Sequence, residues 1–305
     1  MDGGLHAQSS SVEVRAEAEL GAPYTYSHSG ETRRPEAGAD MTASGVPDAP
    51  SAAPRVESYR EIVSRLKAAQ KPAARSAPAY SRFINRRFGR YLAAGAHRLG
   101  LGANAVTLIS AAWTFLAIAL LIIFPPSWIL GIVIAVMLLI GYAFDSADGQ
   151  ISRLQGTSSP AGEWLDHMVD ATKVSTMPLA VAVSFYRFDL IARGWLLVPL
   201  AFAIVSAVLF FCMILTEQLR RAHGTQSLAA DAPGRPSWLR AVLVIPMDYG
   251  VLCLSFVLLG APIVFFVVYT LLFVATTMFL LLALGKWFRE LQGWARPVGT
   301  ARDGA

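Results

Sequence analysis

The chain has 305 residues, of which 54% are hydrophobic and only 15% are charged, with a formal net charge of +5. A soluble domain of this length carries nearer a quarter charged residues, and here residues 99–144 contain no charged side chain at all. These long apolar blocks exclude an ordinary soluble protein. The basic residues flank the blocks, as membrane topology requires, and this placement argues against nucleic acid as a partner.

Two segments precede the apolar blocks. Residues 1–54 are rich in Ala, Gly, Ser, Pro and Glu and lack apolar periodicity, so they are predicted to form a disordered N-terminal tail. In residues 55–98, apolar side chains recur at helical spacing among basic residues, at Tyr59, Ile62, Val63, Leu66, Phe83, Ile84, Phe88, Tyr91 and Leu92. Such basic amphipathic segments predict cytoplasmic, interfacial helices on an anionic leaflet. A soluble helix pair packed on the membrane domain is the alternative.

Six apolar segments follow, each close to the ~20 residues that a helix needs to cross the hydrocarbon core. They are residues 104–124, 128–144, 160–186, 194–216, 238–259 and 262–284. The predicted fold class is therefore an all-α integral membrane protein, with six transmembrane helices preceded by the interfacial helices. The six spans make one domain over residues 99–290, and residues 291–305 are predicted to be a C-terminal tail.

The orientation of the spans follows from lysine and arginine in the short loops. One set of loops and flanks carries Arg82, Arg86, Arg87, Arg90, Arg98, Arg153, Arg220, Arg221, Arg235, Arg240, Lys286, Arg289 and Arg296. The opposite loops carry only Arg187 and Arg193, partly offset by Asp189. This asymmetry predicts a multi-pass protein of the cell membrane with both termini in the cytoplasm.

Four aspartates, Asp145, Asp148, Asp166 and Asp170, lie where the second span ends and the third begins, at the cytoplasmic side. Their spacings of three and four residues put each pair on one helix face, and the short turn LQGTSSPAG lets the two pairs face each other. Converging carboxylates repel one another without cations. Oxygen ligands suit Mg²⁺, Mn²⁺ or Ca²⁺ rather than Zn²⁺, and room for two ions indicates the two-metal arrangement that acts on phosphates.

Two glycines and one arginine complete the pattern. Gly149 directly follows Asp148, and Gly162 lies one turn before Asp166 on the same face. The missing side chains leave space for a flat or bulky group beside the metals, and Arg153 can reach a phosphate with its planar fork of donors. A solvated helix end with incidental acidic residues is the alternative interpretation.

In this sequence the seven residues form the pattern Asp145-x2-Asp148-Gly149-x3-Arg153-x8-Gly162-x3-Asp166-x3-Asp170. The pattern resembles the signature of the CDP-alcohol phosphotransferases. Ser152 stands where this family usually has alanine. A second stretch, from Gly102 through Asn104 to Thr107, is similar to the Pro-Asn-x-x-Thr opening of the family's first span, with Ala103 in place of proline. The resemblance covers about residues 80–285.

The resemblance implies a membrane enzyme of phospholipid biosynthesis that binds a CDP-linked alcohol, with CDP-diacylglycerol as the expected donor. An acceptor hydroxyl attacks the β-phosphorus and CMP leaves. The four aspartates would hold two divalent cations, Mg²⁺ or Mn²⁺, with Asp170 also acting as the general base. Gly149 and Gly162 would make room for cytidine, and Arg153, Asn104 and Thr107 would lie near the nucleotide. The resemblance also implies a homodimer.

Three further polar residues are candidate contacts for substrate. Lys173 shares the aspartate face and would either offset carboxylate charge or contact a phosphate. Asp248 is expected mid-span, where an unpaired carboxylate is costly; it would line a polar cavity on the acceptor side or pair with Arg240 or Lys173. Arg220 would reach an anionic acceptor.

An ion or metal transporter with a carboxylate site is the alternative function, although it does not explain the glycines and the arginine. The acceptor stays open between glycerol phosphate, inositol phosphate, serine and another headgroup. The donor could instead carry the headgroup, with a diacylglycerol as the acceptor.

Overall fold

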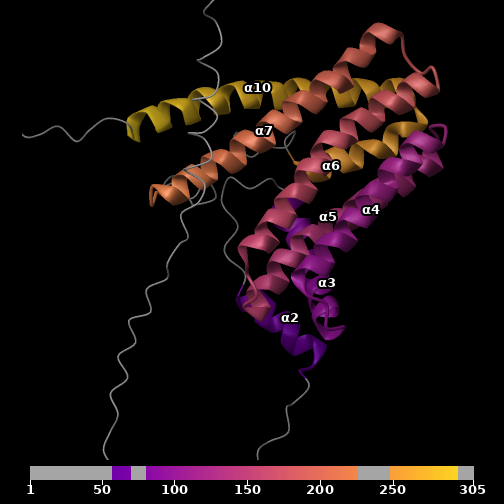
Figure 1. The fold of residues 1–305 in the computed structure, drawn as a ribbon. Helices are drawn as coiled ribbons and strands as arrows, with labels where there is room; N and C mark the ends of the chain where they lie inside the picture. Colours follow the sequence, from indigo (N-terminus) through magenta and orange to yellow (C-terminus); the bar gives the residue numbers. More distant parts are fainter. Residues whose placement is uncertain (1–56, 70–79, 226–247, 295–305) are drawn as a thin grey trace, which may run out of the picture. The chain divides into compact units, whose positions relative to one another are not determined.

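A computed structural model of the protein describes residues 57–69, 80–225 and 248–294. These residues form helices joined by short turns, with no strand in any of the three stretches (Figure 1). The all-α prediction is therefore confirmed for this part of the chain. The tail predicted over residues 1–54 lies outside the described residues. Helix α10 (Pro262–Trp294) continues past residue 290, so the first residues of the predicted C-terminal tail are helical instead.

The N-terminal helices are α2 (Tyr59–Ala68), the π-helical turn η1 (Ser81–Asn85) and α3 (Arg86–Arg98). A capping box starts α2: the Ser58 hydroxyl accepts a hydrogen bond from the Glu61 N–H at 3.3 Å, and the Glu61 carboxylate accepts one from the Ser58 N–H at 2.7 Å. This bonding to the backbone and side chain of Ser58 lowers the pKa of Glu61.

The apolar face of α2 packs on the rest of the protein. Ile62 and Leu66 are buried in one cluster with side chains of α3 and α5, among them Ala93 and Ile151. For α2 this packing fits the alternative of a helix docked on the membrane domain. The large side chains of η1 and α3 behave differently, because Phe83, Phe88 and Tyr91 are all more than half exposed. An interfacial position for these two elements stays a prediction.

Four segments are long and apolar enough to cross a membrane, namely Ala103–Ile123, Trp128–Gln155, Arg193–Ala222 and Pro262–Trp294. They contain α4 (Ala103–Ile123), α5 (Trp128–Gln155), the short turn η2 (Arg193–Leu196) with α7 (Leu197–Ala222), and α10. Four of the six predicted spans therefore correspond to helices with the length and composition of a membrane span.

The other two predicted spans look different. Helix α6 (Pro160–Arg187) is as long as α5, but its N-terminal half carries charged side chains. In the fifth segment, residues 238–247 lie outside the described part, and the remainder forms α9 (Tyr249–Ser255) and η4 (Phe256–Gly260). A membrane-crossing role for these two segments stays a prediction.

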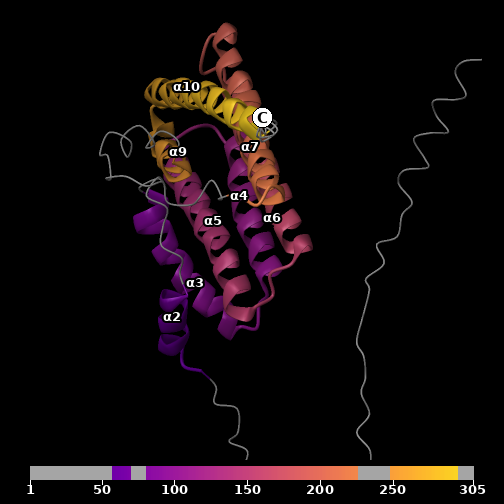
Figure 2. The ribbon, with the colours of Figure 1, turned by 90° about the vertical axis from the view of Figure 1, so that its left-hand side faces the viewer.

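Helix α4 packs between α5 and α6 (Figure 2). Helix α9 and the turn η4 pack against α5, and α7 packs against both α6 and α10. The approach of α4 to α5 depends on Gly141, since a Cβ there would lie 2.6 Å from the Thr114 Oγ1 atom. The Ser110 hydroxyl of α4 also donates a hydrogen bond to the Gly141 carbonyl at 2.8 Å. This close contact brings α4 into reach of the aspartates on α5 and α6.

The predicted orientation is tested at the two ends of α5, whose 28 residues span about 42 Å. Ser127 and Ser158 flank this helix and both are exposed. In a protein whose Cys212 and Cys253 have been replaced, Ser127→Cys should react with an impermeant maleimide on intact cells. Ser158→Cys should react only after permeabilisation. The reverse pattern would place the aspartates outside. Arg235, Arg240 and Arg296, which contributed to the prediction, lie outside the described residues.

Candidate active site

Three of the four predicted metal ligands come together. Asp145 on α5 and Asp166 and Asp170 on α6 each offer a carboxylate oxygen, and these oxygens lie within 4.8 Å of one another. The two helices run antiparallel through a short turn, as the sequence predicted. Oxygen atoms at this separation can share a hard divalent cation.

The turn between α5 and α6 explains why the helices reverse here. Gly156 ends α5 in the left-handed conformation, with a φ of 65° that favours glycine. The Ser159 hydroxyl then caps α6 by accepting a hydrogen bond from the Gly162 N–H at 3.1 Å, and Pro160 follows at the first helical position. Stop and start signals only a few residues apart reverse the chain here, and α4 packs against both helices.

Asp148 lies beside this cluster rather than in it. Its side chain is only 6% exposed. One oxygen accepts a hydrogen bond from the Thr107 hydroxyl at 2.7 Å, and the other accepts one from the Gly149 N–H at 2.5 Å. Thr107 therefore fixes the orientation of Asp148 from α4. Each carboxylate oxygen keeps a further lone pair that could face a cation.

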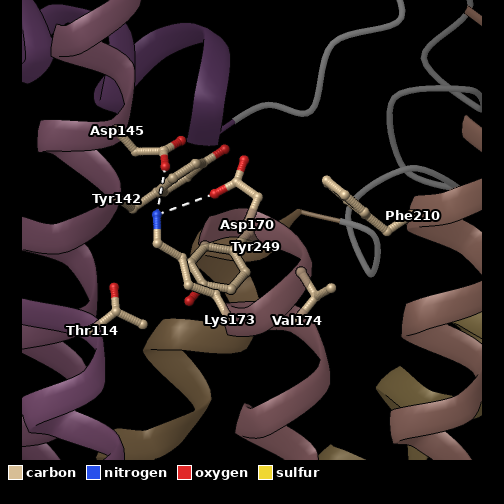
Figure 3. Close-up of a pocket in the computed structure, with 8 residues that line it drawn as sticks. All are labelled: Thr114, Tyr142, Asp145, Asp170, Lys173, Val174, Phe210 and Tyr249. Carbon is tan, nitrogen blue, oxygen red and sulfur yellow. Dashed lines mark hydrogen bonds and ion pairs between the residues drawn. The ribbon is translucent and has the colours of Figure 1, made fainter. Parts of the chain in front are cut away.

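Lys173 offsets the charge of the cluster, the first of the two roles that its position suggested. Its ammonium group lies 2.7 Å from an Asp145 oxygen and 3.1 Å from an Asp170 oxygen (Figure 3). It also donates a hydrogen bond to the Ser110 hydroxyl at 3.0 Å. The residue is 5% exposed. Three carboxylates against one ammonium leave an excess of negative charge at the site.

A cavity of about 160 Å³ adjoins the cluster (Figure 3). Its polar part is lined by Asp145, Asp170 and Lys173, and the rest is lined by Thr114, Tyr142, Val174, Phe210 and Tyr249. Sequence reasoning missed the second group. Tyr142 lies three residues before Asp145 and so shares its helix face, which was a usable signal. Thr114, Phe210 and Tyr249 come from α4, α7 and α9, and no motif marks them.

The two glycines of the pattern each lie beside another predicted nucleotide contact. A Cβ on Gly149 would lie 3.5 Å from the Arg153 guanidinium, so this side chain extends over the glycine. A Cβ on Gly162 would lie 3.1 Å from the Asn104 amide oxygen. The fold therefore places Arg153 beside Gly149 and Asn104 beside Gly162.

Asp248 has a different environment from the expected one. It precedes α9 as its N-terminal cap, is 1% exposed, and accepts hydrogen bonds from the N–H groups of Tyr80 at 2.7 Å and Gly250 at 3.1 Å. Lys173 pairs elsewhere, and Arg240 lies outside the described residues. Because the Tyr80 ring stacks on Tyr142 at 6.2 Å, Asp248 supports the aromatic wall of the cavity rather than lining it.

Arg220 and His167 also have protein partners. The Arg220 guanidinium lies 2.5 Å from a Glu290 oxygen and thus joins α7 to α10. His167 faces Glu163 at 3.6 Å and does not belong to the carboxylate cluster. Neither residue is among those that line the cavity.

The sequence model of the CDP-alcohol phosphatidyltransferases matches residues 101–297. The chain belongs to this family. The protein is accordingly a transferase of phosphate-containing groups in phospholipid biosynthesis, and its four long apolar helices are those of an integral membrane protein. The resemblance found in the aspartate pattern is thereby confirmed.

Among solved structures, one similar to this transferase is the crystal structure of Mycobacterium tuberculosis phosphatidylinositol phosphate synthase (PgsA1) with CDP-DAG bound. The two chains are 20% identical, with a TM-score of 0.44 over 73% of this chain and 99% of that chain. Comparison with curated proteins gives no match.

Proposed function

We propose that this transferase moves a substituted phosphoryl group from a CDP-linked alcohol to the hydroxyl of an acceptor and releases CMP. The observation that carries the proposal is the cluster of Asp145, Asp166 and Asp170, whose oxygens lie within 4.8 Å of one another beside a cavity. Together with membership of the family, it supports phosphoryl transfer over a carboxylate-based transporter. Transport of an ion by carboxylates does not explain the presence of Gly149, Gly162 and Arg153 in the pattern.

The donor set fits two divalent cations, Mg²⁺ or Mn²⁺. All the ligands on offer are carboxylate oxygens, the chemistry that these ions prefer, and the site holds an excess of negative charge. Asp145, Asp166 and Asp170 would hold the cations, with Asp148 completing the set from its position beside Thr107. When bound, the cations neutralise charge on the pyrophosphate.

We assign nucleotide binding to two pairs of residues, Gly149 with Arg153 and Gly162 with Asn104. Gly149 and Gly162 leave room for the cytidine, and the Asn104 amide beside Gly162 offers it a polar contact. The Arg153 guanidinium, which extends over Gly149, presents a planar fork of donors to a phosphate. In this arrangement the protein mainly orients the phosphoryl group, as phosphoryl transfer requires.

The acceptor half is assigned to the cavity. Asp170 lines it and would take the proton of the acceptor hydroxyl as the new bond to phosphorus forms. The donor is proposed to be CDP-diacylglycerol, because a site at the end of membrane helices suits a substrate with a lipid tail and a water-soluble head. We further propose, from the family, that the protein works as a homodimer with its active site at the cytoplasmic face.

Binding of CMP tests the proposal directly. The purified protein should be stabilised by CMP in the presence of Mg²⁺ or Mn²⁺, with a rise in melting temperature of about 5 °C or more at saturating CMP. The same CMP with EDTA should give no shift, because binding of its phosphate depends on the cations. Thermal denaturation with AMP, GMP and UMP provides the specificity control.

Equal stabilisation by the other nucleoside monophosphates, or none by CMP with metal present, would contradict a cytidine site. The acceptor is then found by lipid mass spectrometry of cells that gain or lose the protein. Turnover of CDP-diacylglycerol with a panel of labelled acceptors separates a lipid donor from a headgroup donor.

A further inference from the structure

The Lys173 ammonium group uses all three of its N–H donors inside the protein. Two of them go to Asp145 and Asp170, and the third goes to the Ser110 hydroxyl. These partners come from α5, α6 and α4, so three helices converge on one nitrogen atom. Figure 3 shows the ammonium group linked to both carboxylates, and Lys173 is among the residues that line the cavity.

Ser110 of α4 also fixes the position of the Lys173 ammonium group. Ser110 is fully buried, and its hydroxyl donates to the Gly141 carbonyl at 2.8 Å while its oxygen accepts from Lys173. The orientation of the hydroxyl is therefore determined by α5, and its lone pair points at the lysine. Lys173 is only 5% exposed, so these contacts account for most of its surroundings.

This arrangement puts a positive charge where a metal ion needs negative charge. Asp145 and Asp170 belong to the cluster that fits a divalent cation, yet each already gives an oxygen to Lys173. A divalent cation bound by the same carboxylates lies close to the ammonium, and two positive charges at such range repel strongly in a poorly screened site. The phosphate of a bound nucleotide such as CMP brings further negative charge and relieves that repulsion.

We propose that Lys173 is a built-in counter-ion that weakens binding of divalent metal to the empty site and thereby makes binding of metal and nucleotide mutually dependent. The nucleotide part of this inference rests on the proposed function, whereas the metal part stands on the contacts of Lys173 alone. By linkage, each ligand then tightens the binding of the other by the same factor.

The experiment measures Mn²⁺ affinity by calorimetry on the full-length protein in detergent, with and without CMP. Lys173→Met keeps the length and the apolar stem of the side chain and removes the charge. It should tighten Mn²⁺ binding without CMP by at least about tenfold, and should change it by less than about threefold with CMP present. In the wild type, CMP should tighten Mn²⁺ binding by at least about tenfold. Lys67→Met, which removes an exposed lysine of α2, is the control for net charge and should behave as the wild type.

If Lys173 only stabilises the packing of the three helices, the expected result for Mn²⁺ binding is different. Lys173→Met would then lower the melting temperature without tightening Mn²⁺ binding, and unchanged or weaker Mn²⁺ affinity in this variant overturns the proposal. If the wild type binds Mn²⁺ but not CMP, the proposed function fails, while the comparison without CMP still decides the role of Lys173.

A second variant covers the case in which Lys173→Met does not fold. Lys173→Gln removes the charge but keeps an amide N–H that can donate to a carboxylate or to the Ser110 hydroxyl. Because the repulsion depends on the charge, Mn²⁺ binding without CMP should tighten by at least about tenfold in this variant too. Unchanged or weaker binding in this variant overturns the proposal as well.

Discussion

Replacing Asp170 with asparagine is expected to lower turnover by at least ~10², the usual size of a general-base contribution. Asparagine keeps the shape of the side chain and one oxygen that can still accept the hydrogen bond from Lys173, but it cannot take a proton. Binding of metal and of the CDP-linked donor should therefore stay within about tenfold of the wild type. Steady-state turnover, together with calorimetric titration of Mn²⁺ and CMP, measures both quantities.

Asp145→Asn is the contrasting variant. Asp145 belongs to the same cluster and also lines the cavity, but it is assigned only to metal binding. Its replacement should weaken binding of metal and nucleotide together. Near-normal turnover in Asp170→Asn would show that the base lies elsewhere and that Asp170 is at most a ligand.

Gly162→Leu is expected to lower turnover by about 10²-fold or more, because the leucine side chain fills space assigned to the nucleotide. A misplacement of about 1 Å in an active site can cost that much. The new Cβ would lie 3.1 Å from the Asn104 amide oxygen and 3.2 Å from the Ser159 hydroxyl. The branched side chain would extend beyond it into the region assigned to cytidine. The helix itself should persist, since leucine is the better helix former by somewhat less than about 1 kcal/mol. Turnover and CMP-dependent thermal stabilisation are the measurements.

The chain offers a matched control in Gly95, a helical glycine of α3 whose added Cβ would meet no atom within 4 Å. Gly95→Leu makes the same chemical change away from the cluster and should keep most of the activity. If Gly162→Leu turned over substrate as fast as Gly95→Leu, the nucleotide would have to bind on another face.

The hairpin of α5 and α6 shows how far local patterns can predict this protein. Spacings of three and four residues put the aspartates on helix faces, and the stop signal at Gly156 and the start signal at Ser159 act within a few residues. These are properties of short stretches, so the sequence predicted the approach of Asp145 to Asp166 and Asp170, and the family with it.

Helix ends near the site were harder to predict. The apolar run of the second span ends at Phe144, but α5 continues to Gln155 through Asp148, Gly149 and Arg153. An apolar block marks the part of a helix that lipid or core surrounds, while the backbone hydrogen bonds of the helix continue into its polar part. The charged start of α6 was predicted, since the expected segment of residues 160–186 nearly coincides with the helix Pro160–Arg187.

The sequence by itself determined the class of protein, the family and the carboxylate cluster, because apolar length and helical spacing are local properties. Only the tertiary structure decided which side chains meet across helices. Lys173 was placed on the right face, but its contact with Ser110 needs the close packing of α4 at Gly141. Asp248 binds the Tyr80 N–H, 168 positions away in the chain, and Phe210 and Tyr249 reach the cavity from separate helices. Such contacts depend on how whole helices pack, and no short stretch of sequence contains that information.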